Sequence, residues 1–270
     1  MSTLEAIVLG LVQGLTEFLP ISSSGHLRIV PAFFGWDDPG AGFTAVIQLG
    51  TMAAVLLYFR RDLLEIATAW IRELRVPFRE RSHQANLGWF ILLGTIPISI
   101  FGFVFRDQIE SGARDLYLIG SALILFSFVM LLAERVGSQD RDISELGARD
   151  GVAIGFAQAL ALVPGVSRSG ATISAGLLMG FDRAAAARYS FLLSVPAVVL
   201  SGLFQLQDIG DDGASVSATA IATLVAFASG YASIAWLLRY LARHTLAVFV
   251  AYRIPLGILV LVLAATGAIS

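Results

Sequence analysis

Four polar side chains stand together in the stretch PGVSRSGAT, residues 164–172, which lies between two apolar runs. They are Ser167, Arg168, Ser169 and Thr172. An arginine guanidinium matches phosphate oxygens bidentately and is more weakly hydrated than an ammonium group. Hydroxyl groups, and the N–H groups at the start of a helix, add donors directed at an anion. These residue types predict a site for a phosphate-bearing ligand; the alternative is an ordinary connecting loop with an interfacial arginine.

A second polar cluster occupies QGLTEFLPISSSGH, residues 13–26. Gln13 and Glu17 are four residues apart and therefore share one helix face. A carboxylate in an apolar run is costly unless it is paired or hydrated, so Glu17 is a candidate functional group. At the end of the stretch, His26 is a candidate acid–base or phosphate-binding group. The hydroxyl groups between them, which are candidates for binding substrate, belong to Ser22, Ser23 and Ser24.

Glu17 bears on whether such an anion site serves catalysis or transport. A carboxylate beside an anion site repels the ligand unless a metal ion or a proton intervenes. This requirement favours catalysis. A lipid-phosphate transporter or flippase is the alternative, because a carrier of phosphate-bearing lipids also requires an anion-binding site.

The elements that carry these clusters are those of a membrane protein. Of the 270 residues, 57% are hydrophobic and 14% are charged, whereas soluble domains contain about 25% charged residues. A bilayer core requires about 20 apolar residues as a helix, and continuous apolar runs of that length favour helix over strand. We therefore expect an all-α polytopic membrane protein. Six runs qualify or nearly qualify: 43–59, 87–105, 116–133, 189–206, 216–238 and 246–268.

Charge and cysteine content exclude several other classes of protein. The formal net charge is −2, and no basic tail or stripe predicts binding to nucleic acid. The chain contains no cysteine. Disulfide bonds, thiolate metal sites and a cysteine nucleophile are therefore excluded.

Two further apolar regions, about residues 4–30 and 151–181, are each interrupted by proline, serine and glycine. Proline ends a helix, and glycine permits a tight turn. Each half is too short to span a bilayer alone, so we expect two re-entrant helical hairpins. Irregular backbone at that depth is tolerated only where it is buried in protein or lines a wet cavity. The hairpins are therefore the expected location of the site.

The two interrupted regions match each other at an offset of 145 residues, and three apolar runs follow each of them. We expect one membrane domain, residues 1–270, made of an inverted-topology repeat whose halves are residues 1–135 and 150–270. Each half is a re-entrant hairpin followed by three transmembrane helices. Inverted repeats place their site where the halves meet near the membrane midplane. The matched pairs include Gly10 with Gly155, Gln13 with Gln158, Ser22 with Ser167, and Gly25 with Gly170.

Loop charges predict the orientation in a cell membrane. Residues 60–84 hold six arginines, and residues 239–245 hold two, whereas residues 207–215 hold three aspartates and no cation. Cytoplasmic loops carry the excess of basic residues. This arrangement places 60–84 and 239–245 inside and 207–215 outside. Both termini are then expected outside, with the first hairpin entering from the outer face.

The two polar stretches resemble the two signature motifs of the undecaprenyl-diphosphate phosphatase family, also called bacitracin-resistance proteins. The first signature is Glu or Gln, three residues, then Glu, and Gln13 and Glu17 match it. The second is a Pro-Gly-x-Ser-Arg-Ser stretch ending in Thr, which residues 164–172 match throughout. The resemblance covers essentially the whole chain. It implies hydrolysis of a polyprenyl diphosphate to the monophosphate and inorganic phosphate, at a site opening to the outer face, which recycles the lipid carrier.

The same resemblance implies roles for individual residues. Glu17 is the expected essential carboxylate and, with Gln13, the expected ligand of a divalent cation, Mg²⁺ or Ca²⁺. Many family members carry Glu where this chain has Gln13, which leaves a single carboxylate for the metal. Ser23 and His26 fall on positions implicated in catalysis, and either Ser23 or a water molecule is the nucleophile. Ser167, Arg168 and Thr172 fall on the phosphate-binding positions of the family. The expected partners are the lipid substrate and membrane lipid, with a homodimer as a candidate assembly.

Overall fold

A computed structural model describes residues 1–112, 115–205 and 215–269, and the chain in these ranges is helical, without a β-sheet. Five helices are long and apolar enough to cross a membrane. This agrees with the prediction of an all-α, multi-pass membrane protein. The five are α5 (His83–Val104), α7 (Leu116–Val136), α10 (Arg183–Gln205), α11 (Val216–Leu241) and α12 (Ala247–Ala265).

A sixth candidate span begins as α3 (Gly40–Tyr58) and continues, after a bend of 73°, as α4 (Arg60–Arg72). Treating residues 60–84 as a loop was therefore wrong for its first half. The helix α4 is amphipathic and packs along α5. At this contact a Cβ atom on Gly88 would lie 3.1 Å from the Trp70 ring. After the bend, the face of α4 that carries Trp70 packs against α5.

Two helical hairpins complete the fold. The first joins α1 (Thr3–Phe18) to α2 (Ser23–Phe34), and the second joins α8 (Ala148–Ala159) to α9 (Arg168–Leu178). In the second hairpin one extra turn of 3₁₀ helix, η3 (Leu160–Leu162), precedes the break. Short helices also follow α5 and α4, namely α6 (Arg106–Gly112) and η1 (Phe78–Glu80), and η2 (Ile143–Glu145) precedes α8.

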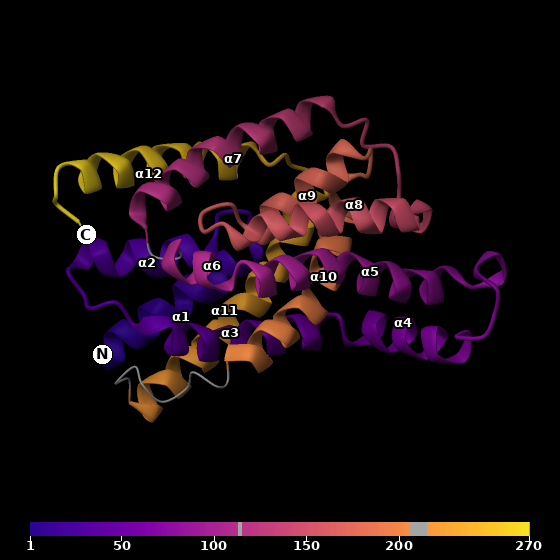
Figure 1. Cartoon of the computed structure of the whole chain (residues 1–270), viewed down its shortest axis with the longest axis horizontal. Coiled ribbons are helices and arrows are strands. Elements are labelled where there is room, and N and C mark those ends of the chain that lie inside the picture. Colours follow the sequence, from indigo (N-terminus) through magenta and orange to yellow (C-terminus); the bar gives the residue numbers. More distant parts are fainter. Residues whose placement is uncertain (113–114, 206–214, 270) are drawn as a thin grey trace.

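The hairpins enter the bundle from opposite ends. In Figure 1, α1 runs inward from the edge that carries both termini, whereas α8 runs inward from the other edge. Each is held by a helix from the other half of the chain, because α1 packs on α11 and α8 packs on α5. Both crossings depend on a glycine. A Cβ atom on Gly10 would lie 2.4 Å from the Ala222 carbonyl oxygen, and one on Gly155 would lie 2.4 Å from the Gly94 carbonyl oxygen.

These crossings allow a test of the packing. Gly155→Ala should destabilise the protein by about 1–3 kcal/mol, because the methyl group would have to displace backbone. Gly102→Ala on α5 is the matched control, since its Cβ would lie 3.7 Å from the nearest side-chain atom of Leu162. Thermal unfolding in detergent measures both variants. Equal melting temperatures for the two would contradict the close crossing.

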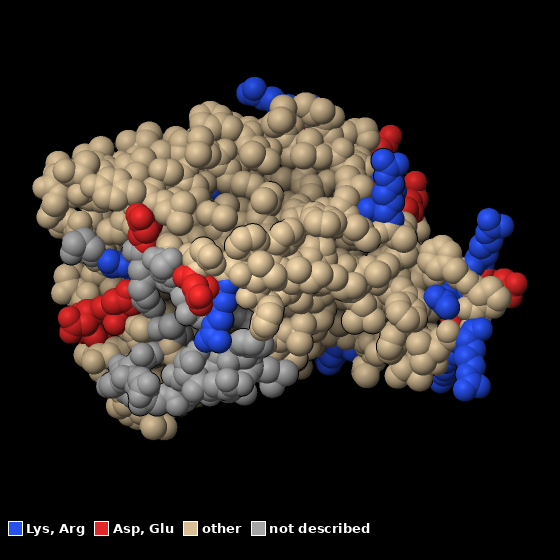
Figure 2. Space-filling view, in the orientation of Figure 1, with Lys and Arg blue, Asp and Glu red and all other residues tan. Residues whose placement is uncertain are grey.

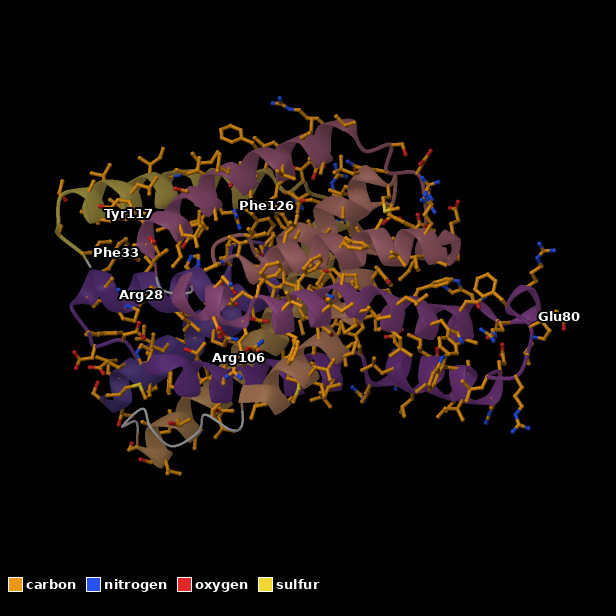
Figure 3. All side chains as sticks on the ribbon, viewed as in Figure 1. Arg28, Phe33, Glu80, Arg106, Tyr117 and Phe126 are labelled. Atoms are coloured by element: carbon orange, nitrogen blue, oxygen red, sulfur yellow. The ribbon has the colours of Figure 1, made fainter. Side chains whose placement is uncertain are left out.

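Charge marks the two ends of the bundle. On the face shown in Figure 2, acidic and basic side chains gather toward the two ends of the long axis, and the middle is almost free of charge. Figure 3 shows Glu80 at one end, and Arg28, Phe33 and Tyr117 toward the other. The middle band has the character of a surface that faces lipid.

Candidate active site

The turns of the two hairpins meet beside a partly open cavity of about 170 Å³. Polar groups from both hairpins line it, with contributions from α3 and α5. The two turns also contact each other directly, because the Gly165 backbone N–H donates to the Ser22 hydroxyl over 3.2 Å. The polar lining consists of Gln13, Glu17, Ser22, Ser23 and Ser24 from the first hairpin, Thr44 and Gln48 from α3, and Ser167 and Arg168 from the second hairpin.

Glu17 is the centre of the hydrogen-bond network in this cavity. Its Oε1 forms an ion pair with the guanidinium of Arg168, and both side chains are largely buried, with 6% and 17% exposed. Its Oε2 accepts the Ser23 hydroxyl at 2.5 Å and the Gln13 side-chain amide at 3.2 Å. A buried ion pair is tolerable only when further hydrogen bonds satisfy its lone pairs. The Ser23 and Gln13 bonds meet that requirement, and Gln13 is held in turn by Thr51 at 3.4 Å.

Ser22 and Ser167 occupy equivalent positions and adopt the same unusual backbone. Their φ angles are 75° and 77°, in a region that non-glycine residues rarely adopt and that is common at functional sites. Each caps the helix that follows it, since the Ser22 hydroxyl accepts from Gly25 N–H at 3.4 Å and the Ser167 hydroxyl from Gly170 N–H at 3.2 Å. The sharp turns thus start α2 and α9 at the cavity.

The start of two helices at one cavity supplies it with groups that favour an anion. A helix N-terminus carries about half a positive charge, together with unpaired N–H groups. Ser23 and Arg168 are the first residues of α2 and α9, and both line the cavity. With the Arg168 guanidinium added, the site can hold a phosphate group between the two hairpins.

Three of the residues named from the sequence do not line the cavity. Thr172 is fully buried, and its hydroxyl contacts that of Ser190 at 2.6 Å and donates to the Arg168 carbonyl at 2.9 Å. Ser169 is buried with its hydroxyl 3.2 Å from that of Ser167. These two residues contact Ser167 and the Arg168 backbone, and so support the turn that carries Arg168.

His26 is the third, and both of its ring nitrogens are engaged. Nδ1 lies 2.7 Å from the Ser22 carbonyl oxygen, and Nε2 lies 2.7 Å from the Tyr252 hydroxyl. A carbonyl oxygen can only accept, so Nδ1 carries a proton. In the neutral ring, Tyr252 then donates to Nε2. The imidazole thereby ties the turn at Ser22 to α12.

Arg253 is a structural element of the site, and it lies on α12, outside both polar stretches. Arg253 is fully buried, and its guanidinium donates to the Pro20 carbonyl at 3.2 Å, the Gly165 carbonyl at 2.8 Å and the Ser127 hydroxyl at 3.1 Å. It therefore joins the turns of both hairpins. The available signal was an arginine within an apolar run, which by itself indicates function.

The donor set of the cavity bears on whether a divalent cation fits. Among the described residues no group of three His, Cys, Asp or Glu side chains could enclose a metal ion. Mg²⁺ is commonly held by one or two carboxylates together with substrate phosphates and water. Glu17, the Gln13 amide and the serine hydroxyls fit that open mode of binding.

Comparison with known proteins gives a consistent result. The family described as "Bacitracin resistance protein BacA" matches residues 6–259. A protein of a Nocardioides species named undecaprenyl-diphosphatase is 54% identical, over 99% of this chain and 98% of the relative. Proteins of the same name from Thermobifida fusca and Myxococcus xanthus are each 53% identical over the whole of this chain, and the matches cover 93% and 92% of those relatives.

Proposed function

This chain belongs to the bacitracin resistance protein (BacA) family, and from that premise we propose that it is an undecaprenyl-diphosphate phosphatase of the cell membrane. It hydrolyses undecaprenyl diphosphate to the monophosphate and inorganic phosphate. This reaction recycles the lipid carrier for cell-wall polysaccharide synthesis and gives bacitracin resistance. The observation that carries the proposal is the buried cluster of Glu17, Ser23 and Arg168 where the two hairpin turns meet.

The cluster supports a reaction through Ser23. Arg168 and the N-termini of α2 and α9 hold the diphosphate, so Arg168 exchanges its contact with Glu17 for phosphate oxygens. The Ser23 oxygen then attacks the terminal phosphorus while Glu17, which already accepts the Ser23 hydroxyl at 2.5 Å, takes the proton. The bond from phosphorus to the bridging oxygen breaks, and polyprenyl monophosphate leaves. Water next hydrolyses the phosphoserine to release inorganic phosphate.

A divalent cation, Mg²⁺ or Ca²⁺, belongs to the proposal. Glu17 and Gln13 are the residues that would hold it, and it would neutralise charge on the phosphate oxygens. Positioning and charge neutralisation supply most of the rate in phosphoryl transfer, and Arg168 performs the same task from the second hairpin.

The membrane arrangement is also part of the proposal. The two hairpins are re-entrant and belong to an inverted repeat, residues 1–135 and 150–270, within one domain. Support comes from the opposite directions of α1 and α8 and from the equivalent turns at Ser22 and Ser167. Both termini lie at the end opposite the arginine-rich connection between α4 and α5. With that connection in the cytoplasm, both termini face outward, and the proposal places the opening of the site on the same side.

Phosphate release tests the proposed function. The purified protein in detergent micelles is given undecaprenyl diphosphate with Mg²⁺, with Ca²⁺ and with a chelator. We expect metal-dependent release of inorganic phosphate, abolished by the chelator. Folded protein that releases no phosphate under any condition would overturn the proposal, and headgroup translocation in vesicles would then test the lipid carrier.

The serine route gives a separate prediction. Ser23→Ala should lower turnover by about 10²-fold or more, because the attacking oxygen and its hydrogen bond to Glu17 are both lost. Ser24→Ala is the matched comparison and should lose far less, since the Ser24 hydroxyl lies 3.2 Å from the Ser22 hydroxyl and is not a partner of Glu17 Oε2, which accepts from Ser23 and Gln13. Substrate labelled in its terminal phosphate should leave label on Ser23 after rapid acid quenching. Full activity of Ser23→Ala would instead assign the attack to water.

A further inference from the structure

A large apolar groove lies beside the polar cavity. Its volume is about 690 Å³, and it is bordered by α5, α6, the start of α7 and the second hairpin. Its lining is almost entirely apolar. The apolar lining includes Phe101, Phe105, Leu118, Phe156, Leu160 and Leu162.

The groove and the cavity share one face of α5. Ile98 lines the polar cavity, whereas Phe101 and Phe105 line the groove. Residues spaced by three and four positions lie on the same face of a helix. A molecule that follows this face of α5 therefore passes from polar to apolar surroundings without leaving the helix.

The second hairpin forms the other shared wall. Ala161 faces the polar cavity, while its neighbours Leu160 and Leu162 line the groove. All three belong to η3, the 3₁₀ turn present in only one of the two hairpins. A few residues later the same backbone carries Arg168. Hence η3, which lies between the groove and the polar cavity, belongs to the same hairpin as Arg168, the residue proposed to bind phosphate.

The ligand that fits two such adjoining spaces is an amphiphile with an anionic head and an apolar chain. Building on the proposed function, we propose that the groove binds the first isoprene units of the polyprenyl chain of the substrate, while the diphosphate occupies the polar cavity. Pockets of about 300–1,000 Å³ hold ligands of small-molecule size, so the groove accommodates the units nearest the phosphate. The remainder of the chain stays in lipid.

The groove acts through shape more than through hydrophobicity. A lipid tail is as apolar as leucine, so moving an isoprenoid chain from bilayer to groove gains no hydrophobic free energy. The gain comes from packing of rigid, methyl-branched units against the rings of Phe101, Phe105 and Phe156. Binding there also fixes the direction from which the diphosphate reaches Arg168, which raises the effective concentration of head group in the cavity.

Filling the groove tests this inference. Ala157 lines the groove on α8, and Ala157→Trp would occupy the space proposed for the chain. Ala153→Trp, one turn earlier on α8, is the control because Ala153 is exposed and lies outside the groove lining. Kinetics are measured in mixed micelles with undecaprenyl diphosphate, farnesyl diphosphate and dimethylallyl diphosphate.

We expect Ala157→Trp to raise KM for the two longer substrates by about tenfold, a discrimination within the range of one hydrophobic pocket contact. KM for dimethylallyl diphosphate, which carries a single isoprene unit, should rise far less, and Ala153→Trp should match the unmodified protein on all three. Equal kinetics of the two variants would overturn the assignment. So would an equal loss on all three substrates, because the tryptophan would then have disturbed the polar cavity.

A labelling measurement on the unmodified protein covers the case in which Ala157→Trp fails to fold. A farnesyl diphosphate that bears a diazirine on its chain should label residues 101–105 or 156–163, and undecaprenyl diphosphate should compete. Labelling of these residues by a diazirine phospholipid, without competition by undecaprenyl diphosphate, would assign the groove to bulk lipid and overturn the inference. If the protein binds and labels but releases no phosphate, the proposed function fails while the groove assignment stands.

Discussion

Glu17→Gln should reduce turnover of undecaprenyl diphosphate by about 10³-fold, within the range for loss of a positioned general base. Glutamine has nearly the same shape as glutamate, but it cannot take the Ser23 proton that Glu17 Oε2 now faces at 2.5 Å. It also leaves the Arg168 guanidinium without its anionic partner. Phosphate release and melting temperature are measured on the same preparation.

A charge-neutral double variant separates chemistry from stability. Removing one partner of a buried ion pair costs about 3–5 kcal/mol, because the other charge stays buried. Glu17→Gln alone should therefore lower the melting temperature, and Glu17→Gln with Arg168→Met should recover much of it. Activity should remain lost in the double variant. If activity returned together with stability, Glu17 would be a structural residue and the proposed mechanism would be wrong.

The composition of the site could be predicted because its residues stand out from an apolar background. Glu17, Ser23 and Arg168 are polar groups in regions too short and too broken to span a membrane, and the structure brings all three to one cavity. Their sequence neighbours set the backbone turns that carry them. Local rules about proline, glycine and helix starts are therefore sufficient to predict which residues lie at the two turns.

The direction of each side chain could not be predicted in the same way. His26 and Thr172 belong to the same polar stretches, yet they point to Tyr252 on α12 and Ser190 on α10. Those partners lie 226 and 18 residues away in the chain. Whether a polar side chain near a turn faces the cavity or a neighbouring helix depends on tertiary packing, and local sequence does not encode that choice.

The helix α4 was missed for a related reason. Its charged residues predict a cytoplasmic loop when only loop charge is considered. Yet Ile66 is buried on its apolar face, and Trp70 packs against Gly88 of α5. An amphipathic stripe of this kind is visible as a 3.6-residue period in the sequence. Arginine density therefore indicates the side of the membrane but does not exclude helix.

Substitution of Arg253 is also expected to lower kcat strongly. Its guanidinium donates to the Pro20 and Gly165 carbonyls, one from each hairpin turn, so we expect it to fix the relative position of the turns that carry Glu17 and Arg168. Arg253→Met keeps the side-chain length and removes every donor. We expect kcat to fall by about 10²-fold, which is the cost of displacing reacting groups by roughly 1 Å.

The variant will also be less stable, since a buried carbonyl that loses its donor costs about 1–3 kcal/mol. Two comparisons isolate positioning from stability. Ser127→Ala removes the 3.1 Å bond to Arg253 but leaves both turn carbonyls paired, so its kcat should remain close to normal. Gly155→Ala should lower stability at the crossing of α8 with α5 while the bonds of Arg253 to both turn carbonyls remain, so its loss of kcat should be smaller for the same loss in melting temperature.

Arg253→Lys distinguishes charge from geometry. The ammonium group keeps the positive charge, but as a compact point charge it lacks the planar fork that reaches both carbonyls. It should therefore restore part of the stability and little of the kcat. A normal kcat for Arg253→Met, or a loss equal to that of Gly155→Ala at matched melting temperature, would show that the two hairpin turns hold their relative position without Arg253.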